Sequence, residues 1–209
     1  MKLAPIFLFL LFIVSACDSK KVQPDNATEV DSLAVQLVNS ATERYGEYIF
    51  GRIESTDSLE VSLNELDKAI EIEPTQIDFY SHKATILLAL GREKQAIQIL
   101  ESALTINPDF AEIITRLGFI NEKIGEMEIA QKWYQRALVA YDKRIEENRF
   151  VVNSKANKAF LLLFTENEET AKKAYSKLKQ EYPDNNEIDY LEFVFEDFDK
   201  EEFLSELYK

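Results

Sequence analysis

Proline recurs at a fixed interval in the middle of this chain. Pro74 and Pro108 lie 34 residues apart, and each closes a segment with the same arrangement of small, apolar and polar residues. A period of about 34 residues is typical of solenoids in which each repeat is a pair of antiparallel helices. Such repeats bury their apolar residues against their neighbours and leave an extended surface exposed. The period therefore predicts an all-α array whose surface binds other proteins.

Residues 77–110 show the arrangement most clearly. One helix is expected before Gly91 and a second between Gly91 and Pro108, because glycine readily takes the left-handed conformation that ends a helix and proline cannot continue one. Small and apolar residues recur at helical spacing in both helices. They are Tyr80, Ala84, Leu87, Leu88, Ala96, Leu100, Ala103 and Leu104.

Residues 111–144 repeat this arrangement, with Gly125 in the turn. Gly118 occupies the position of Ala84, where a small residue lets the paired helices approach closely. The pattern resembles the tetratricopeptide repeat family at most of its defining positions, with Ile114 and Asp142 as departures. The resemblance implies a right-handed α-solenoid of about four helix–turn–helix repeats with a C-terminal capping helix.

The remaining segments are assigned by the same offsets. The expected order is a lipoprotein signal peptide at 1–16, a lipidated cysteine and polar tether at 17–29, a degenerate first repeat at 30–76, the second repeat at 77–110, a third with an extended second helix at 111–151, a fourth at 152–185, and an acidic C-terminal cap at 186–209. Seven inserted residues separate the third and fourth repeats, and the apolar stripe from Trp133 to Ile145 places them as two extra helical turns.

Three local features complete the prediction of helices. An amphipathic helix is expected from Val30 to Ile49, with Leu33 among its apolar residues. Asp57 and Glu60 match a capping box at the start of the next helix. In the fourth repeat Glu166-Asn167 replaces the turn glycine, and asparagine tolerates the left-handed conformation best after glycine.

The N-terminus predicts a lipid anchor. After Lys2, the apolar run from Leu3 to Val14 is shorter than the roughly 20 residues of a membrane-spanning helix and suits a secretory signal. The sequence Val14-Ser15-Ala16-Cys17 resembles a bacterial lipobox. The resemblance implies cleavage before Cys17, acylation of that cysteine, and a location in the cell envelope, with the outer membrane favoured over the inner. An uncleaved anchor and an ordinary secretory signal are the alternatives.

Composition and motifs argue against several classes of function. The formal net charge is −14, which disfavours binding to phosphate backbones, so nucleic acid is not an expected partner. The five glycines are scattered and His82 is the single histidine, so no phosphate loop, catalytic motif or metal motif is recognised. Residues 184–189 carry oxygen ligands but lack the glycine and final glutamate of a calcium loop. We therefore expect no enzymatic activity, no cofactor and no metal site.

The resemblance also implies which residues face the concave groove. They are Asp78, Ser81, Thr85 and Leu88 in the second repeat, Glu112, Thr115, Phe119 and Glu122 in the third, and Asn153, Ala156, Phe160 and Leu163 in the fourth. Phe119, Phe160 and Leu163 are apolar where water is expected, which indicates a docking surface. The alternative is that the extended helix or the C-terminal cap covers them.

The sequence thus predicts a lipid-anchored scaffold or adaptor in the bacterial cell envelope that binds a protein or peptide partner. A permanent structural subunit of an envelope assembly or secretion complex, binding through its convex face, is the alternative. An envelope enzyme with an unrecognised site is a remote third reading.

Overall fold

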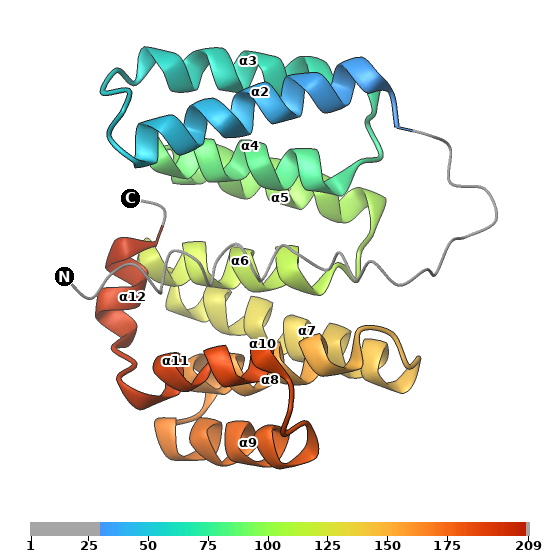
Figure 1. Cartoon of the computed structure of the whole chain (residues 1–209), viewed down its shortest axis with the longest axis vertical. Helices are drawn as coiled ribbons and strands as arrows, with labels where there is room; N and C mark the ends of the chain where they lie inside the picture. Colours follow the sequence, from blue (N-terminus) through green and yellow to red (C-terminus); the bar gives the residue numbers. More distant parts are fainter. Residues whose placement is uncertain (1–29, 208–209) are drawn as a thin grey trace. The chain divides into compact units, whose positions relative to one another are not determined.

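The computed structural model describes residues 30–207, which contain no β-strand and confirm the all-α class. The helices are α2 (Ser32–Ile49), α3 (Asp57–Ile72), α4 (Ile77–Ala89), α5 (Glu93–Ile106), α6 (Ala111–Lys123), α7 (Met127–Glu146), α8 (Val151–Thr165), α9 (Glu168–Glu181), α10 (Asn186–Tyr190), α11 (Glu192–Glu196) and α12 (Lys200–Glu206) (Figure 1). The predicted signal peptide, Cys17 and the tether lie outside the described residues.

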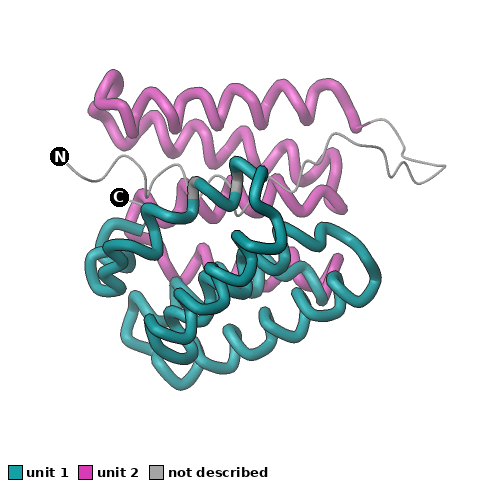
Figure 2. The backbone as a smooth tube through the Cα atoms, turned by 60° about the horizontal axis from the view of Figure 1, so that its bottom comes forward, with its two compact units in different colours: residues 1–19, 109–207 teal, residues 20–108, 208–209 magenta. Residues whose placement is uncertain are grey.

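The described residues fall into two compact units, 30–108 and 109–207 (Figure 2). The first unit holds α2 to α5, and the second holds α6 to α12. Within residues 30–207, no helix has both the length and the apolar character needed to cross a membrane.

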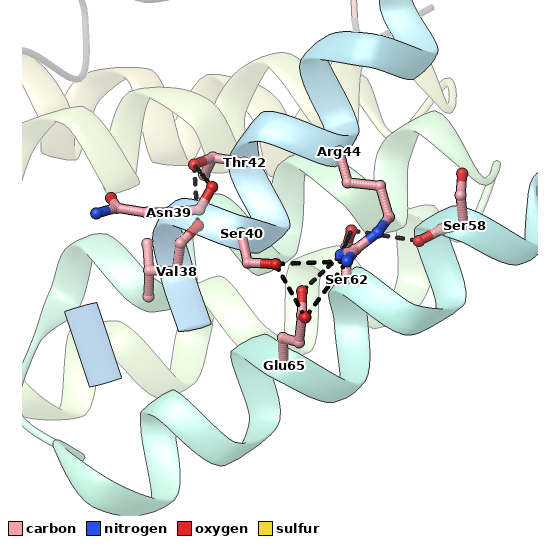
Figure 3. A network of polar contacts seen from close by, with 8 residues as sticks. All are labelled: Val38, Asn39, Ser40, Thr42, Arg44, Ser58, Ser62 and Glu65. Atoms are coloured by element: carbon pink, nitrogen blue, oxygen red, sulfur yellow. Dashed lines mark hydrogen bonds and ion pairs between the residues drawn. The ribbon is translucent and has the colours of Figure 1, made fainter. Parts of the chain in front are cut away.

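In the unit of residues 30–108, a polar network joins α2 to α3 (Figure 3). Arg44 Nη1 donates to Glu65 Oε2 at 2.6 Å and to Ser62 Oγ at 3.2 Å. Ser40 Oγ donates to Glu65 Oε1 at 3.0 Å. The Glu65 carboxylate therefore accepts hydrogen bonds from two residues of α2, which fixes the register of the helix pair.

Apolar packing in this pair agrees only in part with the predicted stripe. The buried apolar residues of α2 and α3 are Ala34, Val38, Ala41, Leu59, Leu63, Leu66 and Ala69. Leu33, which was expected in the stripe, is exposed. Asp31 precedes α2 and its Oδ1 accepts from the Leu33 backbone N–H at 2.8 Å, so this position belongs to the capped first turn.

The predicted capping box at the start of α3 is wrong. Thr56 is the N-cap and makes no side-chain capping hydrogen bond, while Asp57 already lies inside the helix. Glu60 instead forms an ion pair with Arg92, which precedes α5. Arg92, which lies two helices further along the chain, therefore binds the Glu60 carboxylate that would otherwise reach back to the start of α3.

The two turn glycines adopt the predicted conformation. Gly91 has φ 68° and Gly125 has φ 87°. After Gly91, the Arg92 N–H donates to the Leu87 carbonyl at 2.8 Å, which is the backbone bond of a Schellman C-cap. Each glycine therefore ends the first helix of its repeat and turns the chain into the second.

The turn of the fourth repeat is built differently from the prediction. Asn167 has φ −145°, an extended conformation, and its Oδ1 accepts from the Thr170 N–H at 2.9 Å. Asn167 is thus the N-cap of α9 and not a left-handed glycine substitute. The left-handed asparagine lies at the end of α7 instead, where Asn148 has φ 54°.

Helix α7 carries the inserted residues. It has 20 residues, whereas α5 and α9 have 14 each. Beyond it, the Arg149 N–H donates to the Arg144 carbonyl at 2.8 Å, closing the helix around Asn148 in the same way as at the glycine turns.

Gly118 has the steric role that the sequence predicted. A Cβ atom added there would overlap Cε1 and Cδ1 of the Tyr134 ring. Gly118 lies on α6 and Tyr134 on α7, so the missing side chain is what lets this helix pair close.

The C-terminal cap consists of three short helices, α10 to α12, and not of the single capping helix that was expected. Tyr175 of α9 stacks on Phe195 of α11 with ring centroids 4.7 Å apart. Asp199 Oδ1 accepts from the Glu202 N–H at 2.9 Å and starts α12 as a separate helix. Aspartate favours such caps over helix interiors, which explains the interruption.

Candidate protein-binding site

The groove residues predicted in the second repeat differ in their accessibility. Asp78 is exposed and Thr85 is half-buried, whereas Ser81 and Leu88 are buried. Thr85 Oγ1 donates to the Ser81 carbonyl at 3.0 Å. In this repeat, Asp78 and Thr85 are therefore the predicted residues that a partner can reach.

The predicted groove residues of the third repeat are all buried, which corrects the prediction that they form an open surface. They are Glu112, Thr115, Phe119 and Glu122. Thr115 Oγ1 lies 3.2 Å from the Tyr141 hydroxyl of α7. Each of these side chains makes contacts inside the unit of residues 109–207, and none is accessible to a partner protein.

Glu112 and Arg144 form a buried ion pair between α6 and α7. Arg144 donates to both carboxylate oxygens, with Nη2 at 2.8 Å from Oε2, and the Glu112 side chain is 2% exposed. The guanidinium also lies 5.5 Å from the Phe110 ring centroid and 5.9 Å from that of Phe150. The bidentate hydrogen bond and the surrounding aromatic rings compensate for the desolvation of both charges.

An aromatic cluster lies between α6, α8 and α12. The Phe119 ring centroid lies 4.7 Å from that of Phe164, 6.1 Å from that of Phe160 and 5.4 Å from that of Phe203. Tyr134 of α7 borders the same cluster, 5.7 Å from Phe119. Phe119 and Phe160 are thus core residues. The apolar side chains that suggested a docking surface are occupied by the chain itself.

Helix α12 lies beside one end of α6 (Figure 1), and its Phe203 contacts both Phe119 and Phe160. Phe203 is 2% exposed within the cluster, and Phe198, which precedes α12, lies 5.6 Å from Phe160. Of the two covers considered from the sequence, the C-terminal segment is the one found over Phe160. Leu163, one turn further along α8, is buried as well.

Polar contacts fix the ends of α12. The Lys200 ammonium lies 2.9 Å from Glu122 Oε1, and the Tyr134 hydroxyl donates to Glu122 Oε2 at 2.6 Å. At the other end Lys123 donates to the Leu207 carbonyl. Glu122 was predicted to face a partner, and in the structure its carboxylate binds one side chain of α7 and one of α12.

The free energy that holds α12 in place is modest. Full burial of Phe203 and Leu207 contributes about 1.5–3 kcal/mol each. Lys200 is 38% exposed, so its ion pair is partly screened by water. Ordering the residues of α12 opposes these gains. Release of α12 therefore costs less than unfolding of the unit on which it lies.

The predicted residues of the fourth repeat that remain accessible lie at the start of α8. Asn153 and Ala156 are half-buried, and Asn157 Nδ2 donates to Asn153 Oδ1 at 3.0 Å. Ala156 precedes Phe160 by one helical turn and so shares its face of α8. This is the part of the predicted groove of the fourth repeat that α12 leaves accessible.

Sequence reasoning missed several residues of this region. They are Arg144, Phe164, Lys200 and Phe203. Phe164 follows Phe160 by four residues, a spacing that places both on one helix face and that signals the cluster. Lys200 and Phe203 offer no comparable signal, because their partners are far away in the sequence. Across residues 30–207 no cluster of three or more His, Cys, Asp or Glu side chains is placed to hold a metal ion.

Burial raises the pKa of both Tyr134 and Tyr141 above the ordinary tyrosine value, and the hydrogen bond to Glu122 adds to the effect at Tyr134. A raised folded-state pKa contributes stability that is complete below about pH 10 and is lost as the pH rises beyond it. Thermal melts from pH 8 to 11.5 should therefore show a falling midpoint, with a shallower fall for Tyr141→Phe. Equal slopes for wild type and variant would contradict this assignment.

Comparison with known proteins identifies the repeats. Sequence models of the tetratricopeptide repeat match residues 77–110 and 157–185. Small glutamine-rich tetratricopeptide repeat-containing protein 2 of Saccharomyces cerevisiae is 32% identical over 79 residues, which are 38% of this chain and 23% of that protein. Stress-induced-phosphoprotein 1 of Caenorhabditis elegans is 28% identical over 79 residues, which are 34% of this chain and 25% of that protein. The chain thus spans about a quarter of the length of each of these relatives.

Solved structures align over more of the chain at low identity. The MamA protein aligns over 83% of this chain and 88% of its own, with 13% identity and a TM-score of 0.44. Pseudomonas aeruginosa pilF aligns over 84% of this chain and 74% of its own, with 16% identity and a TM-score of 0.48.

Proposed function

Because this chain belongs to the tetratricopeptide repeat family, we propose that it is a protein-interaction scaffold held at a membrane of the bacterial cell envelope by a lipid on Cys17. The scaffold role follows from the repeats, which bind protein partners through surfaces built from consecutive helix pairs. The proposal adds the anchor and the location, with the outer membrane favoured over the inner.

The observation that carries the scaffold role is the match of two separate segments to tetratricopeptide repeats within consecutive helix pairs. The segment of the third repeat between them, α6 and α7, is closed by a glycine at the helix contact.

The anchor is supported by the sequence Val14-Ser15-Ala16-Cys17 after an apolar stretch. Each buried CH₂ group contributes about 0.8 kcal/mol, so two or three acyl chains on Cys17 hold a protein at a membrane effectively permanently. A scaffold confined to the membrane surface meets membrane-associated partners at a raised effective concentration. Anchoring therefore favours capture of partners that work in the envelope.

Lipidation is tested by growing bacteria that express the full-length chain with an alkyne analogue of palmitate. We expect the protein to be labelled and to sediment with membranes, and Cys17→Ala to abolish the labelling. Ser19→Ala is the matched control, because it changes a neighbouring residue of the same segment without removing a thiol. Labelling that persists in Cys17→Ala would refute the anchor.

The scaffold role is tested by purifying the tagged full-length protein from gently solubilised membranes and identifying the proteins that accompany it. We expect a small set of partners that Cys17→Ala recovers less well. Absence of any stoichiometric partner from both preparations would count against the scaffold.

A permanent structural subunit that binds through its outer surface is the second candidate. The observation that favours it lies on the long helix α7, where Val139 is 68% exposed. A protein that is always bound through such residues tends to self-associate when isolated. Light scattering of the mature Cys17→Ala form, residues 17–209, decides between the two. A monodisperse monomer favours the scaffold, and concentration-dependent assembly favours the subunit.

A further inference from the structure

The turn between α2 and α3, residues 50–56, exposes an aromatic ring. Phe50 is 75% exposed, more than any other large apolar side chain in residues 30–207. It does not stand alone, because Tyr48, Ile49 and Ile53 on either side of it are only half-buried. A run of apolar residues that reach solvent together, unlike a single exposed one, marks a surface at which the protein contacts something else.

The exposure of Phe50 is fixed by the backbone and does not come from a frayed helix end. The N–H groups of Arg52 and Ile53 both donate to the Glu47 carbonyl, at 2.9 and 3.2 Å. Gly51, with φ 68°, closes the helix in the left-handed conformation. The closed turn holds Phe50 outward, so little conformational entropy remains to be lost when a binding surface covers the ring.

Arg52 gives the turn a polar side that stays compatible with an apolar one. Its guanidinium lies 5.7 Å from the Phe50 ring centroid, and its Nη1 donates to Glu47 Oε1 at 2.6 Å. The cation is therefore neutralised within the turn. Side chains with an apolar body and a polar tip, such as arginine and tyrosine, suit the boundary between lipid headgroups and acyl chains, where the body is buried and the tip stays hydrated.

The turn is within reach of the membrane at which the proposed lipid holds the chain. Cys17 precedes Val30 by 13 residues, which span at most about 45 Å when extended. Helix α2 has 18 residues, so it is about 27 Å long, and the turn lies at its far end (Figure 1). The anchor also confines the protein to the membrane surface, so a contact too weak to recruit a free protein becomes populated.

We propose that the α2–α3 turn is a second membrane contact: while Cys17 is anchored, Phe50 inserts at the boundary between headgroups and acyl chains, and Arg52 stays among the headgroups. The occupant of this surface is thus a lipid bilayer. The inference rests on the proposed lipid anchor and adds the orientation of the unit of residues 30–108, which then lies at the bilayer with one defined end.

The test couples residues 17–209 to phosphatidylcholine vesicles through the thiol of Cys17, the single cysteine of the chain, and a maleimide-bearing lipid. Trp133 is the single tryptophan, so Trp133→Phe removes the background emission and Phe50→Trp places a reporter in the turn. Vesicles made with acyl-brominated phosphatidylcholine quench a tryptophan that lies in the bilayer. We expect severalfold quenching and a blue-shifted emission at position 50, and circular dichroism checks that each variant stays folded.

Ile72→Trp in the same background is the matched control. Ile72 is 38% exposed at the other end of the helix pair, next to Glu73, whose Oε1 accepts from the Asp31 N–H at 2.9 Å. It therefore lies beside the point where the tether joins the fold and reports any quenching that tethering alone produces. We expect ordinary emission from position 72 in both kinds of vesicle.

A charge change tests the chemistry of the contact. Arg52→Glu in the Phe50→Trp chain leaves Glu47 beside a second carboxylate, which resists removal from water, and should abolish the quenching. Lys68→Glu makes the same change of charge at an exposed position of α3 and should leave the quenching unaltered. Quenching that Arg52→Glu and Lys68→Glu reduce equally would reflect the overall charge and would count against the contact.

Absence of quenching at position 50, or equal quenching at positions 50 and 72, overturns the membrane contact. Either result leaves the proposed anchor standing, because the maleimide attaches the chain without bacterial acylation and the palmitate analogue reports on acylation alone. A benzophenone amino acid at position 50 in living cells separates a lipid from a protein occupant. A protein adduct from that position overturns the proposal, and its absence, together with quenching in vesicles, supports it.

Discussion

Replacing Arg144 with methionine is expected to destabilise the protein by about 3–5 kcal/mol, because the Glu112 carboxylate, 2% exposed, is then left buried without its counter-charge. The substitution also removes the contacts of the guanidinium with the rings of Phe110 and Phe150. For a chain of this size the thermal midpoint should fall by roughly 10 °C. Urea unfolding followed by circular dichroism measures the change.

The double variant Glu112→Leu/Arg144→Met shows whether the stability lost in Arg144→Met comes from the unpaired Glu112 charge or from lost packing. Because both charges leave together, it should be markedly more stable than Arg144→Met alone. Arg136→Met is the matched control, an exposed arginine on the same helix α7, and should cost less than about 1 kcal/mol. A double variant as unstable as the single one would show that the pair is not what holds α6 to α7.

Gly118→Ala is expected to destabilise the protein by about 2 kcal/mol or more, since the added Cβ overlaps the Tyr134 ring. That ring cannot move aside easily. Its hydroxyl is bound to Glu122, and its ring centroid lies 5.7 Å from that of Phe119. The clash outweighs the gain of up to about 1 kcal/mol that alanine brings to a helix interior.

Gly46→Ala makes the same substitution at a position where we expect it to stabilise the protein. Gly46 lies inside α2, and a Cβ atom there meets nothing within 4 Å. It should therefore stabilise the protein by up to about 1 kcal/mol through helix propensity and reduced freedom of the unfolded chain. If Gly118→Ala and Gly46→Ala change the stability in the same direction, the close approach of Tyr134 is not the reason why position 118 is a glycine.

The helical repeats were predictable because their signals are local. Gly91 and Gly125 each end a helix by a backbone conformation that glycine adopts without strain, and the period between prolines spaces the helix pairs. The asparagines were harder, because one residue type suits two roles. Asn148 ends α7 in the left-handed conformation, whereas Asn167 caps the start of α9, and the sequence around each does not decide between them.

The candidate site was predictable only in position. The family resemblance placed Glu112 and Phe119 on the first helix of the third repeat, as the structure does. The burial of Glu112 was missed because it depends on Arg144, which lies 32 residues along the chain. The sequence left open whether Phe119 is exposed or covered, and the structure shows that α12 covers it. Charged residues are rarely fully buried, so an exposed Glu112 was the reasonable expectation. The cap is interrupted because the Asp199 side chain caps α12. In the sequence, this capping signal is weaker than the helical pattern of apolar residues around it, so one continuous helix was expected.

The central claim, that the chain is a scaffold that binds another protein, is tested most directly by photo-crosslinking in living cells. The start of α8 is the place to test it, because α12 leaves this part of the predicted groove of the fourth repeat accessible. A benzophenone amino acid placed at Ala156, half-buried in this part, is compared with one at Lys173, exposed on α9. We predict a single protein adduct from position 156 that is absent from position 173. Adducts of equal strength at both positions, or an adduct from position 173 alone, would contradict the claim.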